Sequence, residues 1–227
     1  MDVALELLDP LVFDKAYAWA LPRPSAPGDL SNGTYPDPSA TLLGAAPESL
    51  WPRDNIYRQI ISILIVTQLG ATSLYFFFST LSYYLIFDRR LEYHPRFLKN
   101  QVRQEIQSSL SAVPFINILT LPWFLAEVRG KSLLYADVSE HGYSWLLISA
   151  VLYMAFNDIG IYWIHRLEHH PSVYRYIHKP HHKWIGELDM RQLRRRHANG
   201  ASTLVPTPWA ALAFHPLDGY VQSLPYQ

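Results

Sequence analysis

Six histidines fall within eighteen residues in the second half of the chain, which contains ten histidines in all. They occupy the run HRLEHHPSVYRYIHKPHH as His165, His169, His170, His178, His181 and His182. Imidazole is the commonest metal ligand in proteins, and a neutral ring offers one nitrogen lone pair. The run directly follows an apolar stretch long enough to cross a bilayer. The sequence therefore predicts a metal site that faces one aqueous surface of a membrane.

The spacing of the first three histidines predicts the end of a helix. His165 and His169 are four residues apart, so on a helix they share one face. The apolar stretch before them favours that continuation, and Pro171 stops it. His170 points to a different side of the helix and is available to a second metal or to a neighbouring group.

The last three histidines predict the start of another helix. Pro180 suits a first helical turn, which places His181 and His182 just inside the helix and His178 just before it. The two patterns, H-x3-H-H and H-x2-H-H, therefore come from two helix ends that face each other across a short linker.

The type of donor limits the choice of metal. Nitrogen-only donors suit iron, zinc, copper or nickel, whereas magnesium and calcium prefer oxygen. Six histidines exceed the four ligands of a closed zinc site and fit two metals better, particularly two irons that each keep an open position for dioxygen. No carboxylate ligand is evident in the pattern.

Other polar residues near the histidines are predicted to have supporting roles. Asp158 lies seven residues before His165 on roughly the same helical face, which suits a carboxylate that accepts a hydrogen bond from the N–H of a metal-binding ring. An interfacial aspartate without that role is the alternative. His94 and His141 are interpreted as interfacial or hydrogen-bonding residues rather than ligands.

Composition excludes several classes of protein. The formal net charge is zero, which argues against a nucleic-acid binder recruited by bulk electrostatics. The chain has no cysteine, which excludes a disulfide framework, a zinc ribbon, an iron–sulfur cluster and a thiolate-ligated haem.

Three apolar stretches predict membrane spans at about 60–87, 106–126 and 142–164. The second contains Pro114 and Pro122 and is either a kinked span or one arm of a re-entrant hairpin. The third is bordered by tyrosine and tryptophan, which favour the membrane interface. The predicted fold class is all-α: a multi-pass membrane helical bundle, incomplete at the C-terminus, with a cytosolic histidine-rich cap.

Loop charge predicts the orientation of the spans. The basic residues of the three connections, in chain order, are Arg89, Arg90, Arg96, Lys99 and Arg103; then Arg129 and Lys131; then Arg166, Arg175, Lys179 and Lys183. The positive-inside rule therefore places the first connection and the histidine run on the cytosolic side.

The chain is predicted to divide into three regions. Residues 1–57 are Pro-rich and are expected to form a mostly irregular arm, in which LELLDPLVFDKAYAWAL is a candidate membrane-surface piece. Residues 58–164 form the transmembrane region, and residues 165–227 a partial cytosolic histidine-box domain.

Three stretches carry a resemblance to a known family: EYHPRFLKNQVRQEI, NDIGIYWIHRLEHHPSVYRYIHKPHHKW and PTPWAALAFHPLDGYVQSLPY. The chain resembles the membrane-bound fatty-acid hydroxylase superfamily, and most closely its fungal sterol C5-desaturases. The resemblance covers most of residues 1–185 and again 206–226.

The resemblance implies two non-haem irons held by histidine boxes at the cytosolic face of the endoplasmic reticulum membrane. Dioxygen would be the co-substrate, and electrons from NADH or NADPH would arrive through cytochrome b5 and its reductase. The reaction would introduce the C5–C6 double bond into a Δ7-sterol of ergosterol biosynthesis. The expected partners are thus these electron carriers, the sterol and membrane lipid, and no nucleic acid.

Ligand roles carry over to seven histidines of this chain. His165 and His169 belong to the first box, and His178, His181 and His182 to the second; His170 and His215 match further family histidines.

The sequence departs from the family pattern in two places. A third H-x2-H-H box, expected further along, is absent from this sequence. Residues 186–205, GELDMRQLRRRHANGASTLV, match nothing in the family and are interpreted as a retained intron or a mis-predicted exon. His197 within them has no expected ligand role. We therefore expect the 227-residue chain alone to restore little or no Δ5,7-sterol to a desaturase-deficient yeast.

Other functions stay open from the sequence. Within the superfamily, a C4-methyl sterol oxidase or a fatty-acid hydroxylase uses similar histidine boxes. A non-catalytic membrane protein that binds zinc or iron is a different class of alternative. A transporter is disfavoured because the histidines cluster outside the spans.

Overall fold

The computed structural model describes residues 1–23, 49–94, 97–132, 137–185 and 205–226. Within these ranges every regular element is a helix, and the only extended pairing is an isolated bridge between Pro22 and Ser49. The predicted all-α fold class is therefore confirmed. Residues 186–204, which hold most of the non-matching stretch, lie outside the described residues.

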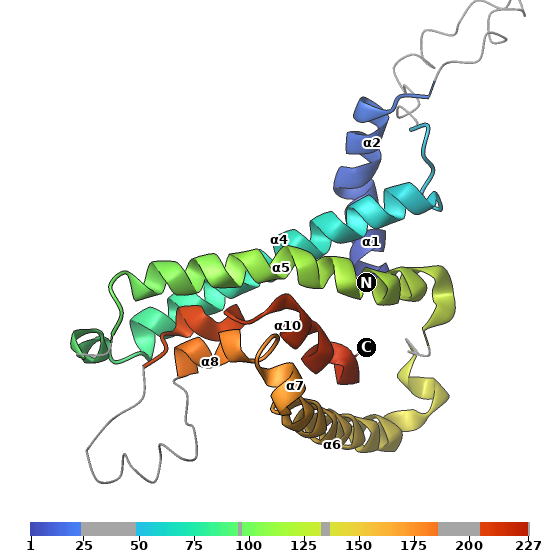
Figure 1. Cartoon of the computed structure of the whole chain (residues 1–227). Helices are drawn as coiled ribbons and strands as arrows, with labels where there is room; N and C mark the ends of the chain where they lie inside the picture. The colour runs from blue at the N-terminus through green and yellow to red at the C-terminus, as the bar shows by residue number, and fades with distance from the viewer. Residues whose placement is uncertain (24–48, 95–96, 133–136, 186–204, 227) are drawn as a thin grey trace, which may run out of the picture. The chain divides into compact units, whose positions relative to one another are not determined.

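Three long helices dominate the chain (Figure 1): α4 (Ile56–Leu85), α5 (Gln101–Ala126) and α6 (Gly142–Glu168). All three are long and apolar enough to cross a membrane, as the sequence predicted. α5 runs as one helix through Pro114 and Pro122. The chain is therefore a helical membrane protein.

The helices belong to two compact units. Unit 1 consists of Met1–Val66 and Phe124–Ser132, and unit 2 of Thr67–Trp123 and Leu133–Gln227. Unit 1 contains α1 (Asp2–Leu8), the π-helical turn η1 (Asp9–Phe13), α2 (Asp14–Ala20), the start of α4 and η3 (Glu127–Lys131). Residues 2–20 of the arm expected to be irregular are thus helical, while residues 24–48 lie outside the described part of the chain.

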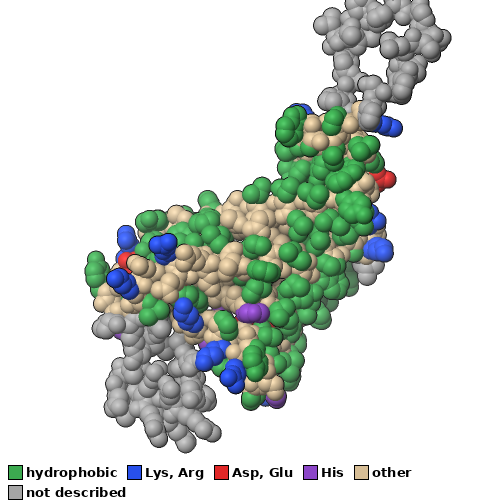
Figure 2. Space-filling model, turned by 45° about the horizontal axis from the view of Figure 1, so that its top comes forward, with side chains coloured by type: hydrophobic (Ala, Val, Ile, Leu, Met, Phe, Trp, Pro, Cys, Tyr) green, Lys and Arg blue, Asp and Glu red, His purple; other side chains and the backbone are tan. Residues whose placement is uncertain are grey.

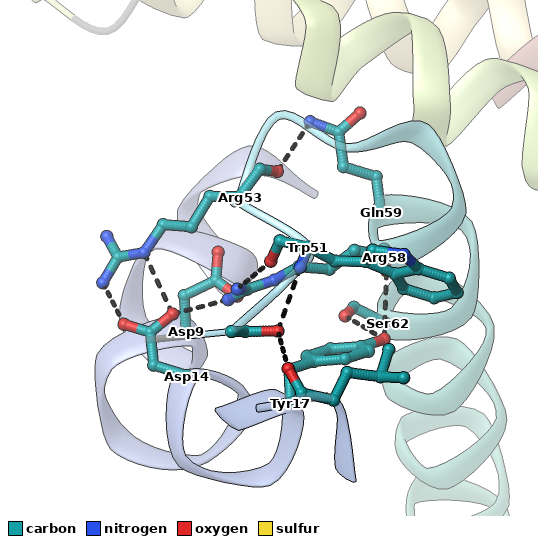
Figure 3. Close-up of polar contacts among 10 residues, drawn as sticks. Asp9, Asp14, Tyr17, Trp51, Arg53, Arg58, Gln59 and Ser62 are labelled. Carbon is teal, nitrogen blue, oxygen red and sulfur yellow. Dashed lines mark hydrogen bonds and ion pairs between the residues drawn. The ribbon is translucent and has the colours of Figure 1, made fainter. Parts of the chain in front are cut away.

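A buried arginine joins the N-terminal helices of unit 1 to α4 (Figure 3). The Arg58 guanidinium donates to Asp9 at 2.9 Å, to Asp14 at 2.5 Å and, at 3.1 Å, to the backbone carbonyl of Trp51. It also lies over the ring of Tyr17, at 4.9 Å from the centroid. Burying a guanidinium is tolerated here because charged and aromatic partners surround it.

Asp14 is shared with a second, exposed arginine. Arg53 donates to both oxygens of its carboxylate (Figure 3). The hydrogen bond from Arg53 is the main reason that the pKa of Asp14 is lowered, so this carboxylate stays charged at neutral pH.

In unit 2, α4 and α5 run antiparallel. Asn117 donates to Gln68 at 2.8 Å near one end of the pair, and the buried Tyr83 lies in a cluster with Val102 near the other. These contacts bury one face of each helix and leave the opposite faces apolar and exposed.

A buried polar stripe on α5 holds the segment that leads into the C-terminal helices. Gln101, Glu105 and Ser109 follow one another at four-residue intervals and are fully buried. Gln101 donates to the Val205 carbonyl at 2.9 Å, and Glu105 accepts from the hydroxyl and the amide of Thr207. The stripe therefore fixes where the chain after residue 204 re-enters the bundle.

Trp209 completes this attachment. Its carbonyl accepts from Tyr75 of α4 at 2.8 Å and from Ser109 of α5 at 3.1 Å. Its ring packs against Tyr75 and Tyr83 in the hydrophobic cluster. The remaining short helices of unit 2 are η2 (Arg89–Tyr93), η4 (Val138–Glu140), α7 (Pro171–Tyr174), α8 (Lys179–Ile185), η5 (Pro208–Leu212), α10 (Pro216–Ser223) and η6 (Leu224–Tyr226).

The last two of these helices lie against α6. Gly160 of α6 allows the close approach, because a Cβ there would come within 2.7 Å of the Pro225 ring. The rest of α6 is exposed: only 6% of its most apolar stretch is buried, and Leu147 is 70% accessible. Figure 2 shows hydrophobic side chains over much of the visible face. Such a surface suits contact with lipid.

Candidate metal centre

Four of the predicted histidines come together at the end of α6. His165, His169, His178 and His182 each offer one ring nitrogen, and these nitrogens all lie within 4.8 Å of one another. The ring of His178 is central to the group, with its centroid 4.5 Å from that of His165, 4.7 Å from that of His169 and 4.6 Å from that of His182. We call these four residues the four-histidine group.

The C-terminal end of α6 positions His165 and His169. α6 carries His165 in its last turn and ends at Glu168, and the His169 amide, at the C-cap, donates to the His165 carbonyl at 3.2 Å. Pro171 then occupies the first position of α7, where its missing N–H costs nothing. The predicted helix end at this proline is confirmed.

The first turn of α8 positions His178 and His182. The His178 carbonyl accepts from the amides of His181 and His182 at 3.1 and 3.4 Å, which closes the first turn. Pro180 lies in that turn, as the sequence predicted. His182 thereby faces back toward His169, with ring centroids 5.0 Å apart.

Two buried nitrogens in the group have no hydrogen-bond partner among the described residues: Nε2 of His178 and Nε2 of His182. An unpaired buried nitrogen is costly, because it has given up its hydrogen bond to water. A metal ion bound among the four rings would satisfy both nitrogens. Nitrogen donors at this spacing fit iron or zinc, so the residues present suit the metal that the family resemblance implies.

Burial keeps the histidines on α8 and just before it in the form that binds metal. It lowers the pKa of His178 to about 4 and also lowers the pKa of His181 and of His182. At neutral pH these rings are uncharged and keep a lone pair.

Two buried acidic side chains, Glu168 and Asp218, lie beside Nδ1 of His178, and burial raises the pKa of Glu168 to about 8. Nδ1 of His178 lies 3.1 Å from Oδ2 of Asp218 and 3.6 Å from Oε2 of Glu168. Sequence reasoning missed both acids. The sequence pattern showed no carboxylate ligand, although Glu168 lies between two predicted ligands and Asp218 follows the predicted ligand His215 by three residues.

The other predicted ligands lie outside the four-histidine group. His181 is the nearest, with its ring 5.5 Å from that of His178 and 6.2 Å from that of Phe214. His170 and His215 occupy the N-caps of α7 and α10, where Nδ1 of each accepts from the amide two residues later. An N-cap satisfies an otherwise unpaired helix amide. Their Nε2 atoms take no part in these caps.

Asp158 lines a pocket that it shares with His165 and His169. A pocket of about 570 Å³ is lined by Asp158, Ile161, Tyr162, His165, Arg166 and His169. Its volume is within the range of small-molecule sites. An apolar ligand in this pocket would lie directly beside two of the four rings.

The fold and the site define a class: a helical membrane protein in which four histidine rings converge at the end of one long apolar helix. Comparison with curated proteins narrows that class. The chain is 69% identical, over all of its 227 residues, to Delta(7)-sterol 5(6)-desaturase erg3C of Aspergillus fumigatus, of which it covers 60%. It is 55% identical over its whole length to Delta(7)-sterol 5(6)-desaturase ERG3B of Gibberella zeae, of which it covers 66%.

An animal protein is also similar. Human lathosterol oxidase is 49% identical over 178 residues, which are 78% of this chain and 53% of the human protein. These similarities confirm the resemblance to the sterol C5-desaturases. The chain spans 60% of the Aspergillus relative's length and 66% of the Gibberella relative's. No family model matches the chain, and no solved structure matches it.

Proposed function

We propose that this chain carries the histidine centre of a sterol C5-desaturase. In this proposal the four-histidine group binds non-haem iron, and the protein introduces the C5–C6 double bond into a Δ7-sterol with dioxygen. The supporting observation is the convergence of four imidazole nitrogens within 4.8 Å of one another, in a group that also contains two buried ring nitrogens without a partner among the described residues. The sequence similarity to Δ7-sterol 5(6)-desaturases supplies the reaction.

Bound iron would supply the oxidising power that removal of hydrogen from an unactivated carbon requires. Desaturation takes two hydrogens from the sterol, and reduction of dioxygen to two waters needs two further electrons and two protons. Cytochrome b5 and its reductase, fed by NADH or NADPH, are the proposed source of those electrons. Of the two irons that the resemblance implies, the four-histidine group accounts for one, and His170, His181 and His215 are the remaining histidine donors proposed for the second.

The residues beside the group have separate tasks in the proposal. Ile161 and Tyr162 would offer apolar surface to a rigid sterol in the pocket that His165 lines. The exposed apolar face of α6 would let the sterol enter sideways from the bilayer, in which it dissolves. Asp158 lines the same pocket and would accept a hydrogen bond at its polar end.

We place the protein in the endoplasmic reticulum membrane with the four-histidine group on the cytosolic side. Lys183 of α8 donates to Gln104 of α5 at 3.3 Å, so the histidine segment and the connection after the first span lie at the same end of unit 2. Both segments are basic, as cytosolic loops are under the positive-inside rule.

A replacement experiment in yeast tests the reaction. The matching portion of the Aspergillus fumigatus desaturase is replaced by this chain, with and without residues 186–205, in a strain that lacks C5-desaturase. We expect Δ5,7-sterol from the chimera without that segment, and none from the same chimera carrying His165→Ala. Absence of Δ5,7-sterol from both chimeras, with the parent enzyme active, would contradict the proposal.

The same lipid extracts separate the alternatives. Loss of C4-methyl groups or hydroxylated fatty acids would favour a C4-methyl sterol oxidase or a fatty-acid hydroxylase. Metal analysis addresses the non-catalytic reading: one zinc and no iron would favour a structural metal protein, and about two irons would favour the oxygenase class.

A further inference from the structure

We propose that Asp218 is a positioning residue for the metal centre, which fixes the tautomer and the orientation of His178 with help from Glu168 and Gln222. The inference rests on the proposed function in one respect, that the four-histidine group binds metal. It assigns a role to two acidic residues, Asp218 beyond the histidine boxes and Glu168 within the first of them.

The two sides of the His178 ring have different surroundings. The side chain is fully buried, and its Nδ1 lies 3.1 Å from Oδ2 of Asp218, which is also fully buried. Its Nε2 is buried and has no hydrogen-bond partner among the residues described. A carboxylate only accepts, so the contact with Asp218 requires the hydrogen on Nδ1. The lone pair is then on Nε2, on the side of the ring left for a metal.

Asp218, rather than Glu168, makes this hydrogen bond. Oε2 of Glu168 is 3.6 Å from Nδ1 of His178, which is too long. Glu168 contributes indirectly, through the side chain of Gln222. The Gln222 amide donates to Oδ1 of Asp218 at 2.5 Å and to Oε2 of Glu168 at 3.0 Å. The amide group therefore holds the two acids together and leaves Oδ2 of Asp218 for the histidine.

The supporting residues come from two different helices. Glu168 is the last residue of α6, and Asp218 and Gln222 lie one turn apart on α10. The fold thus joins the end of a span to a helix forty residues beyond His178 through one buried histidine. Because His178 is already held in this orientation, its side chain loses little conformational entropy when the metal binds.

The test measures Co²⁺ affinity of the full chain in lipid nanodiscs, together with ¹⁵N shifts of the His178 ring in the metal-free chain. Asp218→Ala should weaken Co²⁺ binding by about 10- to 100-fold, the usual cost of losing an outer-shell partner. Asp218→Asn should lose less, because the amide oxygen still accepts from Nδ1. Asp137→Ala is the control: Asp137 is the N-cap of η4, before α6, where its carboxylate accepts from the amide of Ser139 at the opposite end of that helix from the rings. It should bind Co²⁺ as the unmodified chain does.

The unmodified chain should show His178 with the hydrogen on Nδ1, and Asp218→Ala should shift the ring toward a mixture of tautomers. Finding the hydrogen on Nε2 in the unmodified chain would overturn the inference even if the alanine variant fails to fold. Unchanged Co²⁺ affinity and tautomer in a folded Asp218→Ala chain would overturn it as well. If the unmodified chain binds no Co²⁺ at all, the metal centre itself fails, and the proposed function fails with it.

Discussion

The Nε2 atoms of His165 and His169 lie 3.2 Å apart, one turn from each other at the end of α6. Two neutral rings at this distance have either one hydrogen shared between the nitrogens or two lone pairs directed at a common cation. The ring of Tyr174 stacks on His169 at a centroid distance of 5.7 Å, which restricts the rotation of that ring. The end of α6 therefore holds two metal-ligand nitrogens close together before a metal binds. Binding requires only that the hydrogen shared between these two Nε2 atoms leave this position.

The acid sensitivity of the centre follows from the buried rings. The pKa of His178 is lowered to about 4 by burial, so folding favours its neutral form. Above the ordinary histidine pKa of about 6.5, the folded and unfolded states bind the same protons at this residue. As the pH falls from about 6.5 to about 4, the unfolded chain gains a proton that the folded chain does not, and stability is lost over that window.

Metal binding should follow the same window. Protonation of His178 should leave the Co²⁺ affinity almost unchanged between pH 8 and pH 6.5. The affinity should then fall steeply toward pH 4, where this ring gains its proton. Titration of the His178 ring by NMR in the metal-free chain gives the midpoint directly. A midpoint near the ordinary value of about 6.5 would refute the prediction.

Gly219 is predicted to be essential for the placement of α10. A Cβ at this position would come within 2.2 Å of the Phe214 ring, so Gly219→Ala should cost about 1–3 kcal/mol as Phe214 is displaced. Because Asp218 is the adjacent residue, Co²⁺ affinity should fall as well. Gly70→Ala, in the helix α4 with nothing within 4 Å of the new Cβ, is the control and should be neutral or stabilising by about 0.5–1 kcal/mol. Thermal melting and Co²⁺ titration of both variants check the prediction, and equal behaviour of the two would disprove it.

Two arginines of unit 1 should differ in their importance although both contact Asp14 (Figure 3). Arg58→Ala leaves Asp9 without its buried partner and should cost about 3–5 kcal/mol. Arg53 is 54% exposed, so water screens its ion pair with Asp14 and Arg53→Ala should cost much less than Arg58→Ala. Thermal unfolding of the two variants in the same detergent compares them, and a larger effect of Arg53→Ala would show that the buried pair does not hold unit 1 together.

The absence of cysteine makes the orientation of the chain easy to measure. Single substitutions Arg175→Cys, between α7 and α8, and Ser139→Cys, in η4 before α6, place one thiol on each side of the third span. In sealed microsomes a membrane-impermeant maleimide should label Cys at 175 and leave Cys at 139 unlabelled until detergent is added. The opposite pattern would place the histidines in the lumen and exclude the proposed electron supply.

The helices of this site could be predicted from the sequence because their signals are local. Four-residue spacing, Pro171 and Pro180 gave the two helix ends, and uncharged stretches gave the spans. The carboxylates could not be predicted in the same way. Asp218 reaches His178 only because α5 and Trp209 fix the returning segment, and that packing leaves no pattern in the sequence.

The structure also adds a second role to two predicted ligands. His170 and His215 each precede a proline and cap the helix that the proline begins, through Nδ1. A His-Pro pair is therefore explained locally by capping, whereas the proposed metal accounts for the convergence of the four-histidine group.

Iron retention tests the central claim most directly. The purified chain is loaded with Fe²⁺ without oxygen, desalted and analysed for metal, beside His165→Ala, His182→Ala and the control His141→Ala. His141 lies at the opposite end of α6 from the four-histidine group. We expect the unmodified chain and His141→Ala to retain at least one iron, and the other two variants to retain little. Equal iron in all four proteins, or none in the unmodified chain, would contradict the account.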